Sequence, residues 1–215
     1  MSNTVAESVE NDLLRGLEAL ELDLSAEAVG RLLQFIHLLA KWNKAYNLTA
    51  IRDPRRMVSL HLLDSLAMLP WLQGDNVLDV GTGPGLPGIP LAIARPDIHF
   101  TLLDSNSKKT RFITQAVLEL GIGNVSVVQS RAEAFQPDGQ YSVIIARAFA
   151  GIPEMLDMVK HLCTARTRII AMKGQYPTDE LHDWPTGFVC ESIEALKVPE
   201  LEAARHVVLI HRERT

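Results

Sequence analysis

Four glycines fall within eight residues of this chain, directly after an apolar run with the composition of a buried strand. The run from Val77 to Val80 leads into Gly81-Thr82-Gly83-Pro84-Gly85-Leu86-Pro87-Gly88, a stretch almost without side chains. A tight turn with positive φ explains one or two glycines but hardly four. A bare turn before a helix N-terminus lets a ligand approach the backbone closely. We therefore expect a ligand-binding site at this turn.

Two carboxylates near the glycines limit the kinds of ligand that could bind there. Residues 83–88 satisfy the dinucleotide fingerprint G-x-G-x-x-G, and Asp104 ends the next predicted strand, where an acid would hold a ribose. The motif alone does not separate a nicotinamide dinucleotide from S-adenosylmethionine. Asp79, two residues before the first glycine, favours S-adenosylmethionine, because a carboxylate there would attract an ammonium and a sulfonium but repel a pyrophosphate.

The elements that must position this turn change character near Gly74. Before it, apolar residues recur at helical spacing from Leu13 to Ala40, and Ser25 is placed to cap the second helix. A third helical stretch is expected from Asp53 to Leu69, with Pro54 in its first turn and Pro70 closing it. Residues 1–73 are therefore predicted to form a helical extension.

After Gly74, short apolar runs alternate with helical segments, which is the pattern of an α/β fold with a parallel sheet. The last two predicted strands have no good helix between them, so we expect an antiparallel pair at one sheet edge. Residues 74–215 should form a seven-stranded, mostly parallel sheet. The predicted strands are Asn76 to Val80, Ile98 to Leu103, Val125 to Gln129, Tyr141 to Ala146, Arg168 to Met172, Phe188 to Leu196 and His206 to His211, and the helices are Gly88 to Arg95, Ser107 to Leu120, a short one near Ala132, and Pro153 to Leu162.

Composition fits one sizeable core, since 47% of the 215 residues are hydrophobic. Cys163 and Cys190 are too few and too far apart for a disulfide framework or a structural zinc site. The first residues lack a signal-peptide pattern, and no stretch approaches the ~20 apolar residues that span a bilayer. We expect a soluble, cytoplasmic, monomeric protein without a membrane partner.

Charge is unevenly distributed along the chain. The formal net charge of -5 argues weakly against a nucleic-acid partner. Residues 1–30 carry seven acids and one base, whereas residues 31–70 carry six bases and two acids. A solvated helix face gives the same pattern, and charge alone favours that interpretation.

Six motifs, in order, make the assignment narrower. They are Lys41-Trp42-Asn43-Lys44-Ala45-Tyr46-Asn47-Leu48-Thr49, His61-x-x-Asp64-Ser65, Gly81 to Pro90, Leu103-Asp104-Ser105, Arg131-Ala132-Glu133 and Arg147-Ala148-Phe149-Ala150. The order of a strand, a D-x-G-x-G-x-G turn, a helix, a strand and an acid in residues 74–215 resembles class I S-adenosylmethionine methyltransferases, which have a Rossmann-like fold. From residue 39 to 212 the chain resembles the glucose-inhibited division protein B family. That family consists of bacterial methyltransferases that modify N7 of one guanine in small-subunit (16S) ribosomal RNA.

The resemblance implies a donor site for S-adenosylmethionine and no metal. The backbone of Arg131-Ala132-Glu133 should border the adenine, with Ala132 leaving room for the ring, and Leu86 should supply an apolar wall. The expected donor-site residues are Asp79, Gly81, Gly83, Gly85, Leu86, Asp104, Ala132, Glu133 and Arg147.

The loop after the fourth predicted strand bears on the atom that is methylated. It reads Ala146-Arg147-Ala148-Phe149, whereas methyltransferases that act on exocyclic amines commonly have [D/N]-P-P-[Y/F/W] there. Methylation at C5 of a pyrimidine needs a cysteine nucleophile beside this loop, and neither cysteine is placed for that role. Guanine N7 needs neither device, because its lone pair is available and no proton leaves. Catalysis then reduces to positioning and electrostatics.

Arg147 is the candidate catalytic residue, forked onto the donor carboxylate or onto an RNA phosphate. The alternative is a structural ion pair with Asp79 or Asp104. The partner is expected to be small-subunit ribosomal RNA, naked or in the assembled ribosomal subunit. Its phosphates should contact a set of basic side chains, each of which is otherwise a solvated charge: Arg52, Arg55, Arg56, Lys108, Lys109, Arg111 and Lys173.

His61 and Asp64, three residues apart on one helix face, are interpreted as a packing or capping pair, since a third metal ligand is not apparent. Two other functions remain open at this point. One is a nicotinamide-dependent oxidoreductase on the same fold, and the other is a non-catalytic RNA-binding module that keeps a vestigial pocket.

Overall fold

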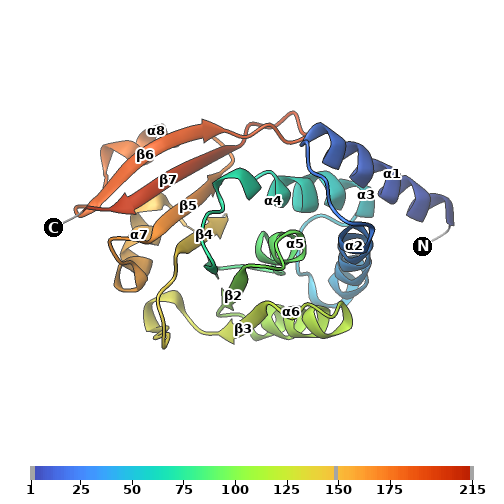
Figure 1. Cartoon of the computed structure of the whole chain (residues 1–215), viewed down its shortest axis with the longest axis horizontal. Coiled ribbons are helices and arrows are strands. Elements are labelled where there is room, and N and C mark those ends of the chain that lie inside the picture. Colours follow the sequence, from blue (N-terminus) through green and yellow to red (C-terminus); the bar gives the residue numbers. More distant parts are fainter. Residues whose placement is uncertain (1–2, 148–149, 214–215) are drawn as a thin grey trace.

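The computed structural model describes residues 3–147 and 150–213, and it contains the predicted seven-stranded α/β sheet (Figure 1). Its strands are β1 (Asn76–Val80), β2 (His99–Asp104), β3 (Val125–Gln129), β4 (Val143–Arg147), β5 (Arg168–Lys173), β6 (Phe188–Ala195) and β7 (His206–Arg212). The spatial order is β3-β2-β1-β4-β5-β7-β6. Strands β1 to β5 are parallel, and β7 is antiparallel to both of its neighbours, as expected for the terminal pair.

Helices cover both faces of the sheet. The helices are α1 (Asn3–Ala19), α2 (Ala26–Tyr46), α3 (Pro54–Met57), α4 (Asp64–Leu66), α5 (Gly88–Ala94), α6 (Ser107–Glu119), α7 (Ile152–Val159) and α8 (Thr178–His182). Figure 1 shows α1 to α6 gathered on one side of the sheet, and α7 on the other. Successive side chains of a strand point to opposite faces. Val77 of β1 accordingly belongs to the larger buried cluster and Leu78 to the smaller one, which packs against α7.

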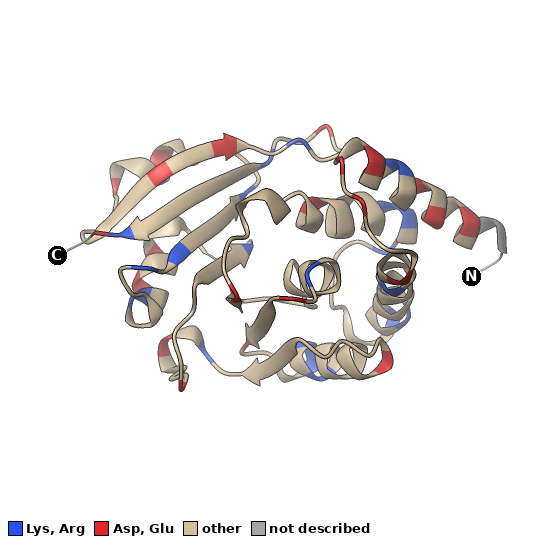
Figure 2. Ribbon diagram, in the orientation of Figure 1, with Lys and Arg blue, Asp and Glu red and all other residues tan. Residues whose placement is uncertain are grey.

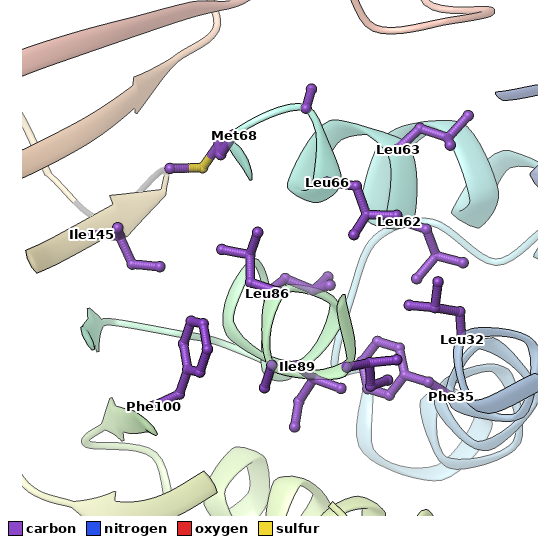
Figure 3. Packing of buried hydrophobic residues seen from close by; sticks show 14 of the residues in the cluster. Leu32, Phe35, Leu62, Leu63, Leu66, Met68, Leu86, Ile89, Phe100 and Ile145 are labelled. Atoms are coloured by element: carbon purple, nitrogen blue, oxygen red, sulfur yellow. The ribbon is translucent and has the colours of Figure 1, made fainter. Parts of the chain in front are cut away.

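The helices before β1 share their core with the sheet. Figure 3 shows Leu32 and Phe35 of α2 and Leu62 packed in the same cluster as Phe100 of β2 and Ile145 of β4. Residues 1–73 and 74–215, predicted as an extension and a domain, therefore bury apolar surface against each other. A boundary at residue 74 stays a prediction.

The starts of α2 and α3 are capped by side chains, that of α2 by the predicted cap Ser25. Ser25 precedes α2 and its hydroxyl accepts a hydrogen bond from the Ala28 amide at 3.2 Å, and Asp53 caps α3 through the Arg55 amide at 3.0 Å. Beyond α3, however, the expected continuous helix to Leu69 is interrupted. Residues Val58–Leu63 form a π-helix, η1, before α4 begins at Asp64. The π-helical segment is only six residues long, too short for its own period to show in the apolar spacing.

Three smaller differences concern element ends. Pro70 lies inside a short 3-10 turn, η2 (Leu69–Trp71), instead of after the helix, and α8 was not predicted. The predicted helix Pro153 to Leu162 is divided into α7 and a 3-10 turn, η4 (Lys160–Leu162). The short element near Ala132 is the 3-10 turn η3 (Ala132–Ala134). Across residues 3–147 and 150–213, none of the helices combines the length and apolar character needed to cross a membrane.

Candidate functional site

The glycine turn lies between β1 and α5 and is fixed to the end of β2. The amides of Gly81 and Thr82 donate to the Leu103 carbonyl at 2.8 and 3.1 Å. Gly83 has a φ of 62°, in the left-handed region that favours glycine. A Cβ on Gly83 would meet no atom within 4 Å. The backbone of the turn is therefore open to a ligand at this residue.

Asp79 is completely buried beneath the turn. Its Oδ2 accepts hydrogen bonds from the Thr82 hydroxyl at 2.6 Å and from the Gly88 amide at 2.8 Å. A Cβ on Gly88 would lie 2.7 Å from this oxygen, so the fourth glycine is required for the close approach. The other oxygen, Oδ1, has no hydrogen-bond partner among the described residues. Such an oxygen is a candidate contact for a cationic group.

Burial raises the pKa of Asp79 to about 7, even though the hydrogen bonds from Thr82 and Gly88 and the nearby charge of Arg147 lower it. The carboxyl group is therefore poised to change its protonation state near neutral pH. A cation placed beside it would favour the ionised form.

Asp104 joins the turn to the start of α6. Its Oδ2 accepts from the Gly83 amide at 2.9 Å, its Oδ1 accepts from the Asn106 amide at 2.8 Å, and Lys109 Nζ lies 3.6 Å from Oδ2. An ionised carboxylate has about four acceptor sites. Asp104 thus keeps lone pairs for ligand hydroxyls while it holds the turn.

A hollow of about 310 Å³ opens beside the carboxyl ends of β1, β2 and β3, the edge at which open α/β sheets bind ligands. Four predicted donor-site residues line it, namely Gly81, Asp104, Ala132 and Glu133. The full lining is Val80, Gly81, Leu103, Asp104, Ser105, Lys109, Ser130, Arg131, Ala132, Glu133 and Met158. The sequence motifs therefore identified most of the side chains that meet here, but not Met158, whose helical spacing on α7 indicated only packing.

Leu86 does not line this hollow. Leu86 is 6% exposed and packs in the larger core near α5 (Figure 3), and its role as an apolar wall for the donor stays a prediction. Met158 contributes an apolar side chain to the lining. Gly85 is also absent from the lining, and a Cβ there would lie 2.6 Å from Ile89. Gly85 is needed for close packing of the turn on α5.

Arg147, at the end of β4, lies against the helices that precede β1. Its Nη2 donates to the Leu60 carbonyl at 2.9 Å, and its Nη1 stands 3.1 Å from Asp64 Oδ2. The ion-pair alternative drawn from the sequence, with Asp79 or Asp104, named the wrong acids. Nη1 is buried and makes no hydrogen bond with the described residues, although the Asp64 charge is close. The next two residues of this motif, Ala148 and Phe149, lie outside the described residues.

His61 fixes the same π-helical segment. Its Nε2 lies 3.0 Å from the Thr49 hydroxyl and its Nδ1 lies 3.0 Å from the Leu60 carbonyl. Burial, with a smaller contribution from the charge of Arg147, lowers the pKa of His61 to about 4. A neutral ring that donates from Nδ1 and accepts at Nε2 satisfies both contacts. Within residues 3–147 and 150–213, no group of three His, Cys, Asp or Glu side chains is arranged to hold a metal ion.

Comparison with known proteins shows the family to which this chain belongs. The family model described as rRNA small subunit methyltransferase G matches residues 29–208. The chain belongs to this family. The resemblance drawn from the six motifs is thereby confirmed, and the oxidoreductase alternative is removed.

Relatives agree with this membership, and a solved structure is similar in fold. A "Ribosomal RNA small subunit methyltransferase G" from Alteromonas mediterranea is 47% identical over 98% of this chain and 100% of its own length. A protein of the same name from Marinobacter nauticus is 52% identical over 92% of each chain. A methyltransferase from Thiobacillus denitrificans, described as S-adenosylmethionine-dependent and solved with S-adenosyl-L-homocysteine, is similar in fold, with a TM-score of 0.52. It is 14% identical, over 71% of this chain and 91% of that one.

The basic side chains expected to bind RNA in this member of the rRNA small subunit methyltransferase G family do not form one set. Figure 2 shows basic segments on α2, α3 and α6, and acidic segments along α1. Four of the cations are exposed and form no ion pair with an acid among the described residues, namely Arg52, Arg56, Lys108 and Arg111. Arg52 there makes one side-chain contact, a 3.3 Å hydrogen bond from its Nη2 to Asn47 Oδ1.

The other three cations are already paired with acids. Arg55 Nε donates to the buried carboxylate of Asp12 at 2.7 Å, and Lys109 Nζ lies 3.6 Å from Asp104. Lys173 Nζ donates to Glu180 at 2.8 Å and to the Ala150 carbonyl at 3.2 Å. Arg55 and Lys173 are therefore structural ion-pair partners, which neither the phosphate-binding nor the solvated interpretation predicted. Asp12 is 43 residues from Arg55, and Glu180 is seven residues from Lys173 on another element, so no spacing within one helix or strand indicated either acid.

Proposed function

We propose that this chain transfers the methyl group of S-adenosylmethionine to N7 of a guanine in small-subunit (16S) ribosomal RNA. The family supports the RNA substrate, since its relatives are named for the small-subunit ribosomal RNA. One observation in the site carries the donor: Asp79 Oδ1, a buried carboxylate oxygen beneath the glycine turn, lacks a hydrogen-bond partner among the described residues.

This oxygen fits the amino-acid end of the donor. The charges of Asp79 and Arg147 are close enough to influence each other's pKa, each favouring the ionised form of the other. An ammonium beside Asp79 would satisfy Oδ1 with a charge-assisted hydrogen bond, and the Arg147 guanidinium, already 3.1 Å from Asp64 Oδ2, would attract the donor carboxylate. A ligand that carries only phosphates would leave Asp79 without a partner.

The remaining contacts follow from the hollow beside β1, β2 and β3. Asp104 would accept hydrogen bonds from the ribose hydroxyls, and the backbone of Ala132 and Glu133 would border the adenine. Gly83, with no atom near the position of a Cβ, lets the donor approach the turn. The bound donor supplies an electrophilic methyl group on its sulfonium.

For transfer to N7, this chain needs to position the guanine and the donor and to stabilise charge. It does not need to supply a proton acceptor. His61 is neutral, and both of its ring nitrogens have partners in the chain. Burial raises the pKa of Cys163 to about 12 and also raises that of Cys190, so neither thiolate forms readily at neutral pH. A lone-pair acceptor such as N7 needs neither a base nor a nucleophile.

The experiment is a tritiated-methyl transfer assay with RNA and ribosomal subunits from a strain that lacks the protein. We expect label in the small-subunit RNA, at a guanine where borohydride and aniline cleave the strand, as they do at N7-methylguanine. No label on any RNA would support the non-catalytic RNA-binding module. Sedimentation of the purified protein tests the monomer that we also propose.

A further inference from the structure

A second hollow, of about 530 Å³, lies between α2 and the segment that leads into α3. It is larger than the hollow at the glycine turn, and it is formed entirely by residues before β1. Its lining is His37, Ala40, Lys41, Asn43, Lys44, Arg52 and Pro54. The site proposed above uses none of these residues.

The lining is basic and contains no acid among the described residues. Lys41, Lys44 and Arg52 contribute three positive charges, and none of them forms an ion pair with an acid in the described part of the chain. A concave surface lined by one sign of charge concentrates counterions more strongly than a flat, solvated face does. This concavity distinguishes the three cations from the solvated helix face that charge counting favoured.

The shape of the lining favours phosphates over bases. Lys41 and Lys44 are three residues apart on α2, which places their side chains about 5 to 6 Å from one another at the Cβ atoms. Arg52 faces them from the next segment. No Phe, Tyr or Trp lines the hollow, so a nucleobase would find no ring of that kind on which to stack. Separated cations without a Phe, Tyr or Trp beside them suit successive phosphates of one strand.

Hydrogen bonds connect the hollow to the end of β4. Asn43, which lines it, accepts from the Thr49 amide at 2.9 Å and donates to the Ile51 carbonyl at 3.1 Å. Thr49 in turn contacts His61, whose Nδ1 shares the Leu60 carbonyl with Arg147. The segment that carries Arg52 is thus held in a fixed relation to the strand end where transfer is proposed.

We propose that this hollow binds backbone phosphates of the substrate RNA, outside the nucleotide that is methylated. The proposal rests on the proposed function, since it takes small-subunit ribosomal RNA as the ligand. It replaces Arg55 and Arg56 of the sequence-based set with Lys41 and Lys44, and it keeps Arg52.

The test compares two triple variants that lose the same charge. One is Lys41→Ala, Lys44→Ala and Arg52→Ala, and the control is Lys160→Ala, Arg166→Ala and Lys197→Ala, at exposed positions away from the hollow. Binding of small-subunit ribosomal RNA from a strain lacking the protein is measured over a range of salt concentrations. The logarithm of the binding constant falls linearly with the logarithm of the salt concentration, and each lost phosphate contact should reduce the steepness of this slope by roughly 0.7 to 0.9.

We expect the hollow variant to lose about 2 to 3 units of slope, and the control to lose less than one, with S-adenosylmethionine affinity unchanged in both. Equal slopes in the two variants would overturn the proposal. Methyl transfer by the wild-type protein is scored separately. A hollow variant with normal RNA binding beside an active wild type refutes the hollow alone. A reduced slope beside an inactive wild type refutes the methyltransferase function alone.

Discussion

Asp64 on α4 stands 3.1 Å from Arg147 at the end of β4, Oδ2 to Nη1, and so joins the helices before β1 to the edge of the sheet that carries the donor site. Its other oxygen accepts from Arg205 Nε at 2.9 Å, just before β7. Asp64 is 1% exposed. One buried carboxylate therefore balances two guanidinium groups from different parts of the fold.

Replacing Asp64 with Asn should destabilise the protein, because Arg147 and Arg205 would both lose their charge partner. Removal of one member of a buried ion pair costs about 3 to 5 kcal/mol, which urea unfolding would measure. Asp157→Asn is the control, since that acid pairs with Lys160 at the surface, where such pairs contribute about 0.2 to 1 kcal/mol. Similar losses in the two variants would mean that the Asp64 cluster is no stronger than a surface pair.

Asp104→Ala should weaken S-adenosylmethionine binding. A hydrogen bond to a charged group contributes about 1.5 to 3 kcal/mol, and we propose that Asp104 accepts from the ribose. Calorimetry measures the affinity. Asp104 also holds the Gly83 and Asn106 amides, so Asp104→Asn, which keeps one oxygen acceptor, should lose less. Unchanged affinity in a folded Ala variant would place the ribose elsewhere.

Donor binding should release a proton from Asp79 at pH 6. The pKa of Asp79 is raised to about 7 in the donor-free protein, so most molecules carry the proton at that pH, and an ammonium beside Oδ1 would favour its loss. Calorimetry in two buffers with different ionisation enthalpies should show a release approaching one proton at pH 6 and a smaller one at pH 7.5. Asp79→Asn should bind more weakly and release none. Equal release by the Asn variant would assign the proton to another group.

The parts of the site that the sequence predicts are those encoded locally. The run from Asp79 to Gly88 specifies a strand, a turn and a helix start within ten residues, so the turn could be placed without knowledge of the tertiary fold. The end of β2 at Asp104 and the short element at Ala132 follow from the same alternation of strands and helices. All of these residues meet at one edge because parallel strands end there.

Contacts between segments far apart in the chain could not be predicted in this way. The acids that hold Arg55, Arg147 and Lys173 come from other elements, and a charged side chain gives no local sign of its partner. The π-helix from Val58 to Leu63 was not predicted either, because the Leu60 carbonyl accepts hydrogen bonds from Arg147 and His61 only in the folded chain. The basic hollow combines residues of α2 with Arg52. A count of charges along the sequence could not show that these residues line a concave surface.

The last prediction concerns His61 and the stability of this π-helical segment at low pH. Burial lowers the pKa of His61 to about 4, from about 6.5 in the unfolded chain. Between these values the unfolded state binds more protons than the folded state, so stability must fall as the pH falls from 6.5 to 4. The full difference in pKa corresponds to about 3 kcal/mol.

His61→Gln removes this titration, although it lowers stability at neutral pH by disturbing the contacts with Thr49 and Leu60. The stability advantage of the wild type over the variant should therefore shrink by up to about 3 kcal/mol between pH 6.5 and 4. Urea unfolding at several pH values measures this difference, in which the titration of groups common to both proteins, such as Asp79, cancels. His182→Gln, at an exposed position, is the control. An advantage that stays constant across this pH range would show that His61 is protonated as readily in the folded protein as in the unfolded chain, and would exclude the neutral ring between Thr49 and the Leu60 carbonyl.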